Sequence, residues 1–253
     1  MALSVAANRF RDELRDFLRC VRRPGLAPRL PGRRASDDAW HADWLPAVSV
    51  SRLVQWAALL WAINLVFLGP IALAAAMAGG AQHRLDLGNV PWLTALIWAP
   101  IVEELVFRYG LRRPGHLWWS LPATVAIMLS GPTWAAILGL AAVVLLFFAL
   151  WQRPSRGQLP WRWARAYRHH FGVVFHFSCL AFAAVHLYNF SLNTMPVWLM
   201  PLLVLPQWLT GMVLAWLRVR RGIGASMLLH AIFNGGPLLV VWLVLRFAPQ
   251  LAA

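Results

Sequence analysis

Most of the chain consists of apolar runs that are long enough to cross a lipid bilayer. Of the 253 residues, 60 % are hydrophobic and only 13 % are charged, a composition typical of a multi-pass membrane protein. A membrane-spanning helix needs about 20 mainly apolar residues. The fold class is therefore predicted to be all-α, a polytopic bundle of about seven transmembrane helices. We expect these spans at about residues 53–78, 91–108, 115–131, 132–151, 171–190, 196–217 and 223–246.

The stretch from residue 115 to residue 151 is predicted to form two of these spans. At about 1.5 Å per residue it is far too long for one crossing of a hydrocarbon core of about 30 Å. Gly131 and Pro132 lie in its middle, and a Gly-Pro pair favours a break between two helices. We therefore expect a tight hairpin there.

The arginines set the expected orientation in the membrane. All 23 cationic side chains are Arg, and with the N-terminus inside, the outer segments carry only Arg84 and Arg246. Cytoplasmic loops of membrane proteins are enriched in such cations. We therefore predict a cytoplasmic N-terminus and, for a chain that has the features of a bacterial protein, a location in the inner (cytoplasmic) membrane.

The first 50 residues differ from the remainder of the chain. They hold six of the nine acidic residues, so we divide the chain into a cytoplasmic Arg-rich leader and linker at residues 1–50 and a transmembrane domain at residues 51–253. Within the leader, apolar residues recur at helical spacing between arginines, which predicts an amphipathic helix on an anionic membrane surface. These apolar residues are Phe10, Leu14, Phe17, Leu18 and Val21.

The distribution of charge argues against a nucleic-acid-binding protein, and the cysteine content argues against a protein built on disulfides or a cysteine metal site. The formal net charge is +14, but the arginines lie in short clusters between apolar runs, so we expect membrane lipid and not nucleic acid as the partner. Cys20 and Cys179 are far apart in the sequence and give neither a disulfide framework nor a metal-binding spacing.

Two adjacent glutamates, Glu103 and Glu104, interrupt an apolar run. After residue 43 the only other acidic residue is Asp86. A carboxylate at membrane depth costs several kcal/mol unless it is paired, hydrated or protonated, so this pair is expected to have a use. Glu104 lies four residues before Arg108, the spacing of an intrahelical ion pair. Because adjacent helical side chains point about 100° apart, we expect Glu103 to face a cavity; a purely structural Glu104–Arg108 pair is the alternative.

Three more polar side chains lie in apolar helices. His186 comes late in the fifth expected span, and His230 and Asn234 are four residues apart on one face of the last span. Singly, each could be a helix-to-helix hydrogen-bonding group, as we expect for His176. Together with the two glutamates they all need partners away from lipid. One shared hydrated pocket is the simplest solution.

Such a pocket has the groups needed to hydrolyse a peptide bond. A carboxylate beside a neutral imidazole can take a proton from water, and a second imidazole with an amide can donate hydrogen bonds to the oxyanion that forms. One Glu and two His could alternatively bind zinc with an open coordination position, although the chain has no His-Glu-x-x-His run.

These residues form three motifs that resemble those of a known family. In chain order they are Glu-Glu-x-x-x-Arg from Glu103 to Arg108, Phe-x-x-x-His from Phe182 to His186, and His-x-x-x-Asn from His230 to Asn234. On separate membrane helices and in this order, they resemble the CPBP family of CAAX proteases and bacteriocin-processing enzymes, also called the Abi family. The resemblance covers about residues 91–240.

The resemblance implies a glutamate-type intramembrane endopeptidase with no required metal or other cofactor. Its substrate would be a membrane-associated protein or peptide, which is a prenylated CAAX protein in eukaryotic relatives. The implied roles are water activation by Glu103 and His186, an oxyanion site formed by His230 and Asn234, and support of the site's geometry by Glu104 and Arg108.

Two other functions use the same pocket without peptide hydrolysis. A non-catalytic membrane scaffold or a bacteriocin-immunity protein would use it for binding, and would keep its phenotype when Glu103 is replaced by Gln. A proton-coupled transporter would use the glutamate and histidines as a relay, but the chain has no internal repeat of the kind that transporters show.

Overall fold

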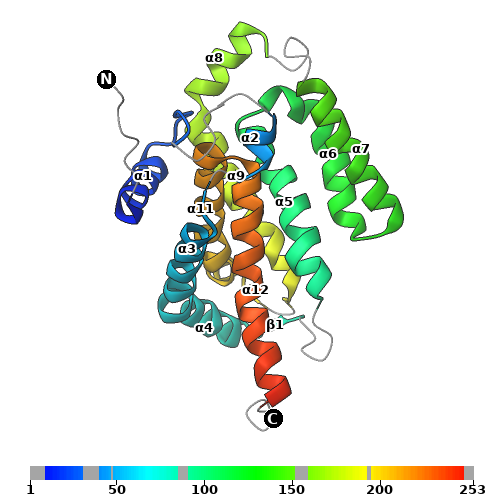
Figure 1. Ribbon diagram of the computed structural model, residues 1–253. Helices are drawn as coiled ribbons and strands as arrows, with labels where there is room; N and C mark the ends of the chain where they lie inside the picture. The colour runs from blue at the N-terminus through cyan, green and yellow to red at the C-terminus, as the bar shows by residue number, and fades with distance from the viewer. Residues whose placement is uncertain are drawn as a thin grey trace.

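The computed structural model describes residues 9–30, 40–46, 48–84, 91–151, 159–192 and 195–247, and these residues are almost entirely helical (Figure 1). The leader contains α1 (Phe10–Arg22) and α2 (Trp40–Trp44). The body begins with α3 (Val50–Ile63), the π-helical turn η1 (Asn64–Leu68), α4 (Gly69–Gly79), the π-helical turn η2 (Thr94–Trp98), α5 (Ala99–Phe107) and the 3₁₀ turn η3 (Tyr109–Leu111). It continues with α6 (Pro114–Ser130), α7 (Trp134–Trp151), α8 (Trp161–His169), α9 (Phe171–Val185), η5 (His186–Asn189), η6 (Val197–Leu199), α10 (Met200–Leu203), α11 (Leu205–Arg221) and α12 (Ile223–Phe247).

The only strands in the described part of the chain are two short segments at one end of the bundle. β1 (Gln82–His83) pairs antiparallel with β2 (Phe190–Ser191), so that Gln82 is opposite Ser191 and His83 is opposite Phe190. This pairing ties the segment after α4 to the end of η5. In Figure 1 it lies near the C-terminus, at the end of the bundle opposite α8 and α2.

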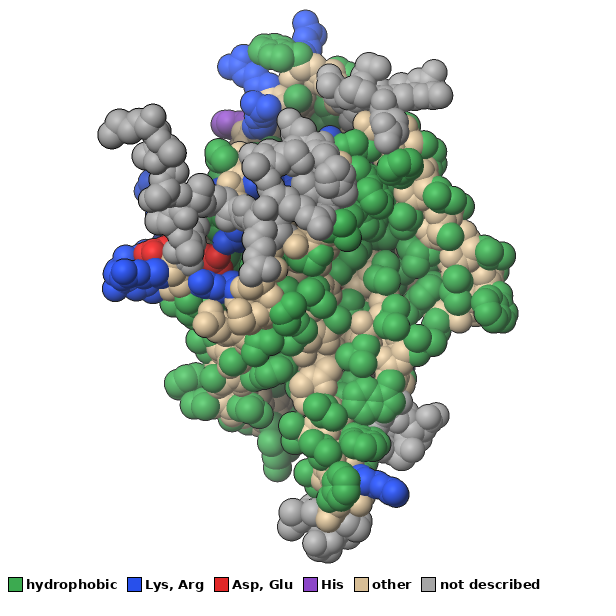
Figure 2. All heavy atoms as spheres, viewed as in Figure 1, with side chains coloured by type: hydrophobic (Ala, Val, Ile, Leu, Met, Phe, Trp, Pro, Cys, Tyr) green, Lys and Arg blue, Asp and Glu red, His purple; other side chains and the backbone are tan. Residues whose placement is uncertain are grey.

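The chain is a multi-pass helical membrane protein, but it has fewer full-length candidate spans than the seven predicted. By length and composition, four helical stretches among the described residues can cross a membrane: Val50–Gly79, Trp134–Trp151, Phe171–Asn189 and Ile223–Phe247. A fifth is possible if Val197–Leu203 and Leu205–Arg221, which are bent by 51°, form one span. The other two predicted spans are helical but shorter than these stretches. One consists of η2 followed by α5, and the other is α6. Figure 2 shows hydrophobic side chains over much of the outer surface of α6, α7 and α12.

The predicted hairpin between residues 115 and 151 is present. α6 ends at Ser130, Gly131 has a φ of 64°, and α7 begins at Trp134 and packs against α6. A positive φ is accessible to glycine without steric cost, which explains why the helix ends at this residue. Tyr109 attaches the hairpin to α5, because its ring stacks on Phe147 of α7 with ring centroids 4.0 Å apart.

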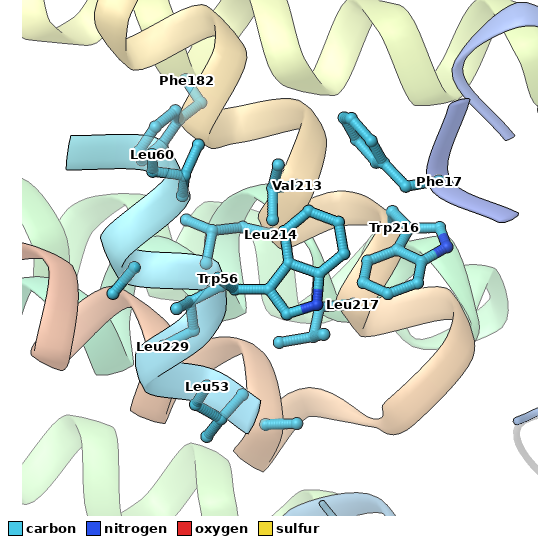
Figure 3. Packing of buried hydrophobic residues seen from close by; sticks show 12 residues of the cluster. Phe17, Leu53, Trp56, Leu60, Phe182, Val213, Leu214, Trp216, Leu217 and Leu229 are labelled. Atoms are coloured by element: carbon cyan, nitrogen blue, oxygen red, sulfur yellow. The ribbon is translucent and has the colours of Figure 1, made fainter. Parts of the chain in front are cut away.

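The sequence pattern of the leader predicted that α1 lies on a membrane surface. In the structure, the apolar face of α1 packs on the protein body instead. Phe17 is 6 % exposed, and its ring contacts Trp56 of α3 and Trp216 of α11 at centroid distances of 5.6 and 6.0 Å. Figure 3 shows these three rings together with the leucines of α11 and α12. The body offers α1 an apolar aromatic surface, so the amphipathic face is satisfied within the protein.

Acidic residues of the leader pair with arginines at the C-terminal end of α11. The three ion pairs are Glu13 with Arg221, Asp16 with Arg220, and Asp43 with Arg218. Two tryptophans also bind these carboxylates: Trp56 Nε1 donates to Glu13 at 3.2 Å and Trp216 Nε1 to Asp16 at 2.9 Å. The leader is therefore packed on the bundle through charges that the sequence places about 200 residues apart.

One of these pairs reaches the end of α5. The Arg218 side chain is fully buried, and beyond Asp43 it donates to the main-chain carbonyls of Arg108 at 3.2 Å and of Tyr109 at 3.1 Å. These carbonyls lie at the C-terminal end of α5, where helical hydrogen bonding stops. Arg218 thus connects the leader to the helix that contains Glu104.

We predict that Asp43→Asn destabilises the protein by about 3 kcal/mol at pH 7, because it leaves the buried Arg218 guanidinium without its counterion. Burial alone would raise the pKa of Asp43, but Arg218 and Arg29 outweigh burial and hold the pKa below its usual 3.8. Ionised Asp43 therefore stabilises the fold above pH 3.8, and this stabilisation is lost as the pH falls through the lower folded pKa.

Thermal unfolding of the detergent-solubilised protein measures this effect. The difference in stability between wild type and Asp43→Asn should be constant from neutral pH down to about pH 4 and shrink below it. Asp12→Asn is the matched control, since the Asp12 side chain is 46 % exposed and surface pairs contribute about 1 kcal/mol or less. Equal effects of the two substitutions would contradict the structural role of Asp43.

Candidate active site

Glu104 is the most completely buried acidic residue of the bundle, and it is hydrogen-bonded by three side chains. Its carboxylate accepts from Arg108 Nη1 at 3.0 Å, from Ser226 Oγ at 2.5 Å and from His230 Nδ1 at 3.1 Å. Arg108 lies one helical turn further along the chain, so the ion pair expected from their spacing is present. Both side chains of this pair are 0 % exposed, so Glu104 is enclosed within protein.

The Arg108 guanidinium has a second contact, with an aromatic ring. Its Cζ atom lies 3.7 Å from the centroid of the Phe182 ring. Two of its nitrogens, Nε and Nη2, are buried and have no hydrogen-bond partner among the described residues. The face of an aromatic ring attracts a cation, so Phe182 compensates part of the charge that Glu104 alone does not neutralise.

His230 stands between the two glutamates. Its Nδ1 is bonded to Glu104, and its Nε2 lies 3.7 Å from Oε2 of Glu103. Since a carboxylate only accepts hydrogen bonds, Nδ1 carries a hydrogen and Nε2 points toward Glu103. A carboxylate bonded in this way fixes the orientation of an imidazole ring.

Glu103 and Glu104 have different surroundings, as the angle between adjacent helical residues led us to expect. The Glu103 side chain is 15 % exposed and lines a cavity. Its Oε2 atom is buried and has no hydrogen-bond partner among the described residues. A buried carboxylate oxygen without a partner is costly, and groups that come from a ligand or water would satisfy it.

His186 lies just beyond the end of α9, as the first residue of η5. Its Nδ1 is 2.8 Å from the main-chain carbonyl of Phe182, and a carbonyl can only accept, so Nδ1 donates. The lone pair of the neutral ring is therefore on Nε2. The Phe182 ring also makes edge contacts with His186 and His230, at centroid distances of 4.6 and 5.7 Å.

Asn234 is fixed by a bond to η2, the turn that directly precedes the helix of the two glutamates. Its Nδ2 donates to the main-chain carbonyl of Ala95, in η2, at 3.0 Å. An amide nitrogen has two hydrogens, so one remains for another acceptor. Ser226, His230 and Asn234 are spaced four residues apart along α12 and therefore share one face of it.

These side chains meet at a cavity of about 610 Å³. Glu103, His186, His230 and Asn234 all line it, and Glu104 and Arg108 lie behind it. Sequence reasoning did not identify Ser226, which bonds Glu104, nor Thr210 and Gln207 of α11, which complete the lining. The four-residue spacing between Ser226 and His230 could have indicated Ser226. Nothing in the sequence singles out Thr210 or Gln207.

The arrangement does not fit the zinc site that was considered from the sequence. Among the residues that the structure describes, no group of three or more His, Cys, Asp or Glu side chains is placed to hold a metal ion.

A comparison with known protein families matches residues 87–236 to the family described as type II CAAX prenyl endopeptidase Rce1-like. The match covers more than half of the chain and contains all three motifs. No curated protein and no solved structure matches the chain. The chain therefore belongs to the Rce1-like family of CAAX prenyl endopeptidases, as its motifs suggested, and this is a family of proteases.

The two adjacent glutamates should respond differently to the same substitution. We predict that Glu104→Gln destabilises the fold by about 3–5 kcal/mol, because it leaves Arg108 buried without a counterion. Glu103→Gln, which removes a charge at the cavity wall, should change stability by no more than about 1 kcal/mol. Thermal unfolding of both variants in detergent, followed by helical circular dichroism, measures the difference. Equal destabilisation would show that the two carboxylates do not have the separate environments described above.

Proposed function

We propose that this protein is an intramembrane endopeptidase that hydrolyses a peptide bond of a membrane-associated protein or peptide. The observation that carries the proposal is the Glu103 carboxylate at a cavity shared with two imidazoles and an amide; its buried Oε2 has no hydrogen-bond partner among the described residues. Membership of the Rce1-like family supports the same conclusion. Glu103, His186, His230 and Asn234, which the three motifs contain and which line the cavity, are the proposed catalytic residues.

In the proposed reaction, Glu103 and His186 activate a water molecule. The water binds in the cavity between the Glu103 carboxylate and Nε2 of His186, both of which are acceptors. As its oxygen attacks the carbonyl carbon of the peptide bond, Glu103 takes one of its protons. When the tetrahedral intermediate collapses, the carbon–nitrogen bond breaks and this proton passes to the leaving amine, so that one water is consumed per bond cleaved.

The oxyanion of the intermediate is stabilised by His230 and Asn234 in this proposal. Asn234 has one amide hydrogen that its bond to Ala95 does not use. His230 donates from Nε2 when both of its ring nitrogens carry hydrogens, and its bond from Nδ1 to Glu104 fixes the ring in place. Donors that are fixed before the reaction begins stabilise a developing charge without reorganisation.

Glu104 and Arg108 have supporting roles in this scheme. With His230 as an imidazolium, the buried set holds two anions, Glu103 and Glu104, and two cations, Arg108 and His230. A set with balanced charges avoids the large cost of an isolated ion inside a membrane protein. Replacing either supporting residue would therefore disturb the site without removing a group that contacts the substrate.

The substrate is proposed to be a peptide segment that enters the bilayer. The family description names CAAX prenyl endopeptidases. The proposed hydrolysis involves only the peptide bond, so it does not require a prenyl group on the substrate. The proposed location is a bacterial inner membrane, in agreement with the distribution of arginines around the apolar runs.

Comparison of protein termini between cells tests the proposal. Membranes and medium from wild-type cells and from a Glu103→Gln strain with the same amount of protein are analysed for peptide ends. Loss of the general base should lower cleavage by about 10²-fold or more, so at least one peptide end should be present in wild type and absent in the variant.

His186→Gln should remove the same peptide end, whereas His169→Gln should retain it. His169 is an exposed histidine of α8 outside the cavity, so it controls for the loss of an imidazole as such. Identical termini in wild type and Glu103→Gln, together with an unchanged phenotype, would favour a scaffold or immunity protein that uses the pocket for binding.

A further inference from the structure

A groove of about 590 Å³ lies between α6 and α8, and its lining is mainly hydrophobic. The residues that form most of its walls are Leu117, Trp118 and Leu121 of α6, Trp163 and Tyr167 of α8, and Val174 of α9. None of these residues lines the cavity that contains Glu103. The groove is therefore separate from the proposed catalytic residues.

α8 has the features of a helix that lies at the surface of a membrane. None of its nine residues is buried, and Trp163 and Tyr167, four residues apart, share the face that lines the groove. The Tyr167 hydroxyl bonds the main-chain carbonyls of Gly110 and Leu111 at 3.3 and 3.0 Å, which fixes α8 beside η3. Trp118 and Trp163 are 76 % and 61 % exposed. Because Trp is enriched at the level of lipid headgroups, these rings place the groove at that level.

A second hollow, of about 470 Å³, is formed by chain neighbours of the groove residues. Arg168 follows Tyr167 of the groove, and Arg112 lies two residues before Pro114, which also lines the groove. Leu26 of the leader completes the lining of this hollow. No acidic residue of the described part of the chain lines it. An anionic ligand there would meet two guanidinium groups and no carboxylate.

Arg112 has hydrogen-bond donors that the protein does not use. Its Nη1 donates to the main-chain carbonyls of Ala27 and Val219 at 3.0 and 2.9 Å. A guanidinium group has five N–H donors, and the described residues supply no acceptor for the other three. The planar arrangement of these donors matches the oxygens of a phosphate group.

The surroundings of Arg112 also contain more cations than anions. The acidic residue that acts on Arg112 and Arg113 is Asp43, which is paired with Arg218. Neither Arg112 nor Arg113 forms an ion pair with an acidic residue among those described. The pKa of Arg112 is lowered to about 10, first by burial and then by the charges of Arg29 and Arg218. A bound anion would offset this repulsion.

We propose that an anionic phospholipid binds at this place, with its phosphate between Arg112 and Arg168 and one acyl chain in the groove between α6 and α8. The cationic hollow and the apolar groove are adjacent, as the headgroup and chain of a phospholipid require. A free phosphate ion would leave the groove unfilled, and a lipid without net charge would not offset the arginines. The site is separate from the catalytic cavity, so this inference does not depend on the proposed function.

The lipid would contact three parts of the chain that are distant in sequence. Leu26 belongs to the leader, Arg112 to the segment between η3 and α6, and Arg168 to α8. A ligand that binds the folded state alone stabilises that state. The bound lipid is therefore expected to hold the leader and α8 against the start of α6.

Lipid binding to the purified full-length protein tests the proposal. The protein is stripped of lipid in detergent and titrated with dioleoylphosphatidylglycerol, which is anionic, or with dioleoylphosphatidylcholine, with and without inorganic phosphate as competitor. Native mass spectrometry measures the fraction of protein that retains one lipid, and helical circular dichroism verifies that each variant is folded.

The variants separate the headgroup from the chain. Arg168→Gln removes a cation of the hollow, Arg168→Lys retains the charge, and Ala166→Trp fills the groove, which Ala166 lines. The matched controls are Arg165→Gln and Ala164→Trp, because these two residues of α8 line neither the hollow nor the groove. Arg165 is two residues from Tyr167 and therefore on the opposite side of α8.

We expect wild type to bind the anionic lipid about fivefold or more tightly than the zwitterionic lipid. Arg168→Gln should weaken binding of the anionic lipid about fivefold, the effect of one cation near a membrane surface, and Arg168→Lys should weaken it less. Ala166→Trp should weaken it by a similar factor or more, because the chain loses its apolar contacts. Arg165→Gln and Ala164→Trp should stay within about twofold of wild type.

Three results would overturn the proposal. Equal binding of the two lipids would show that the headgroup charge is not recognised. Equal effects of Arg168→Gln and Arg165→Gln would show a general attraction to a cationic surface. Displacement of the lipid by inorganic phosphate, together with full binding by Ala166→Trp, would assign a site for a free anion. If Arg168→Gln does not fold, Arg168→Lys and Ala166→Trp decide between these results.

Discussion

The Glu104 carboxylate, bonded by Arg108, Ser226 and His230, is the interaction on which the candidate site depends. A lone carboxylate at this depth would cost several kcal/mol, so its three donors must come together as the helices pack. In doing so they join α5 to α12 and fix the His230 ring. Glu103, one residue earlier, lines the cavity, and its Oε2 has no hydrogen-bond partner among the described residues.

The same kind of pairing connects the leader to this site. Arg218 bonds Asp43 of the leader and the main-chain carbonyls at the end of α5, next to Arg108. The buried ion pair of Asp43 and Arg218 thus connects the leader to the end of α5. The amphipathic helix of the leader is held by aromatic rings of α3 and α11. These contacts hold the leader against the arginine-rich end of α11.

Local spacing predicted a good part of this arrangement. The Glu104–Arg108 ion pair follows from four-residue spacing, the hairpin from Gly131 and Pro132, and the family from three short motifs. The docking of the leader could not be predicted, because Asp16 and Arg220 are 204 residues apart and no local pattern relates them. Only four or five of the seven predicted spans are long and apolar enough among the described residues, because α6 has 17 residues and α5 has nine. Ser226 was missed because a serine in an apolar helix has many possible roles.

The central claim is that water, activated by Glu103, hydrolyses a peptide bond in this cavity. The most direct measurement is to incubate the purified full-length protein with detergent-solubilised membrane peptides in ¹⁸O-labelled water and to search for new C-terminal carboxylates by mass spectrometry. The account predicts new C-termini that carry one ¹⁸O atom with the wild-type protein and none with Glu103→Gln. New C-termini of equal abundance with both proteins would contradict it.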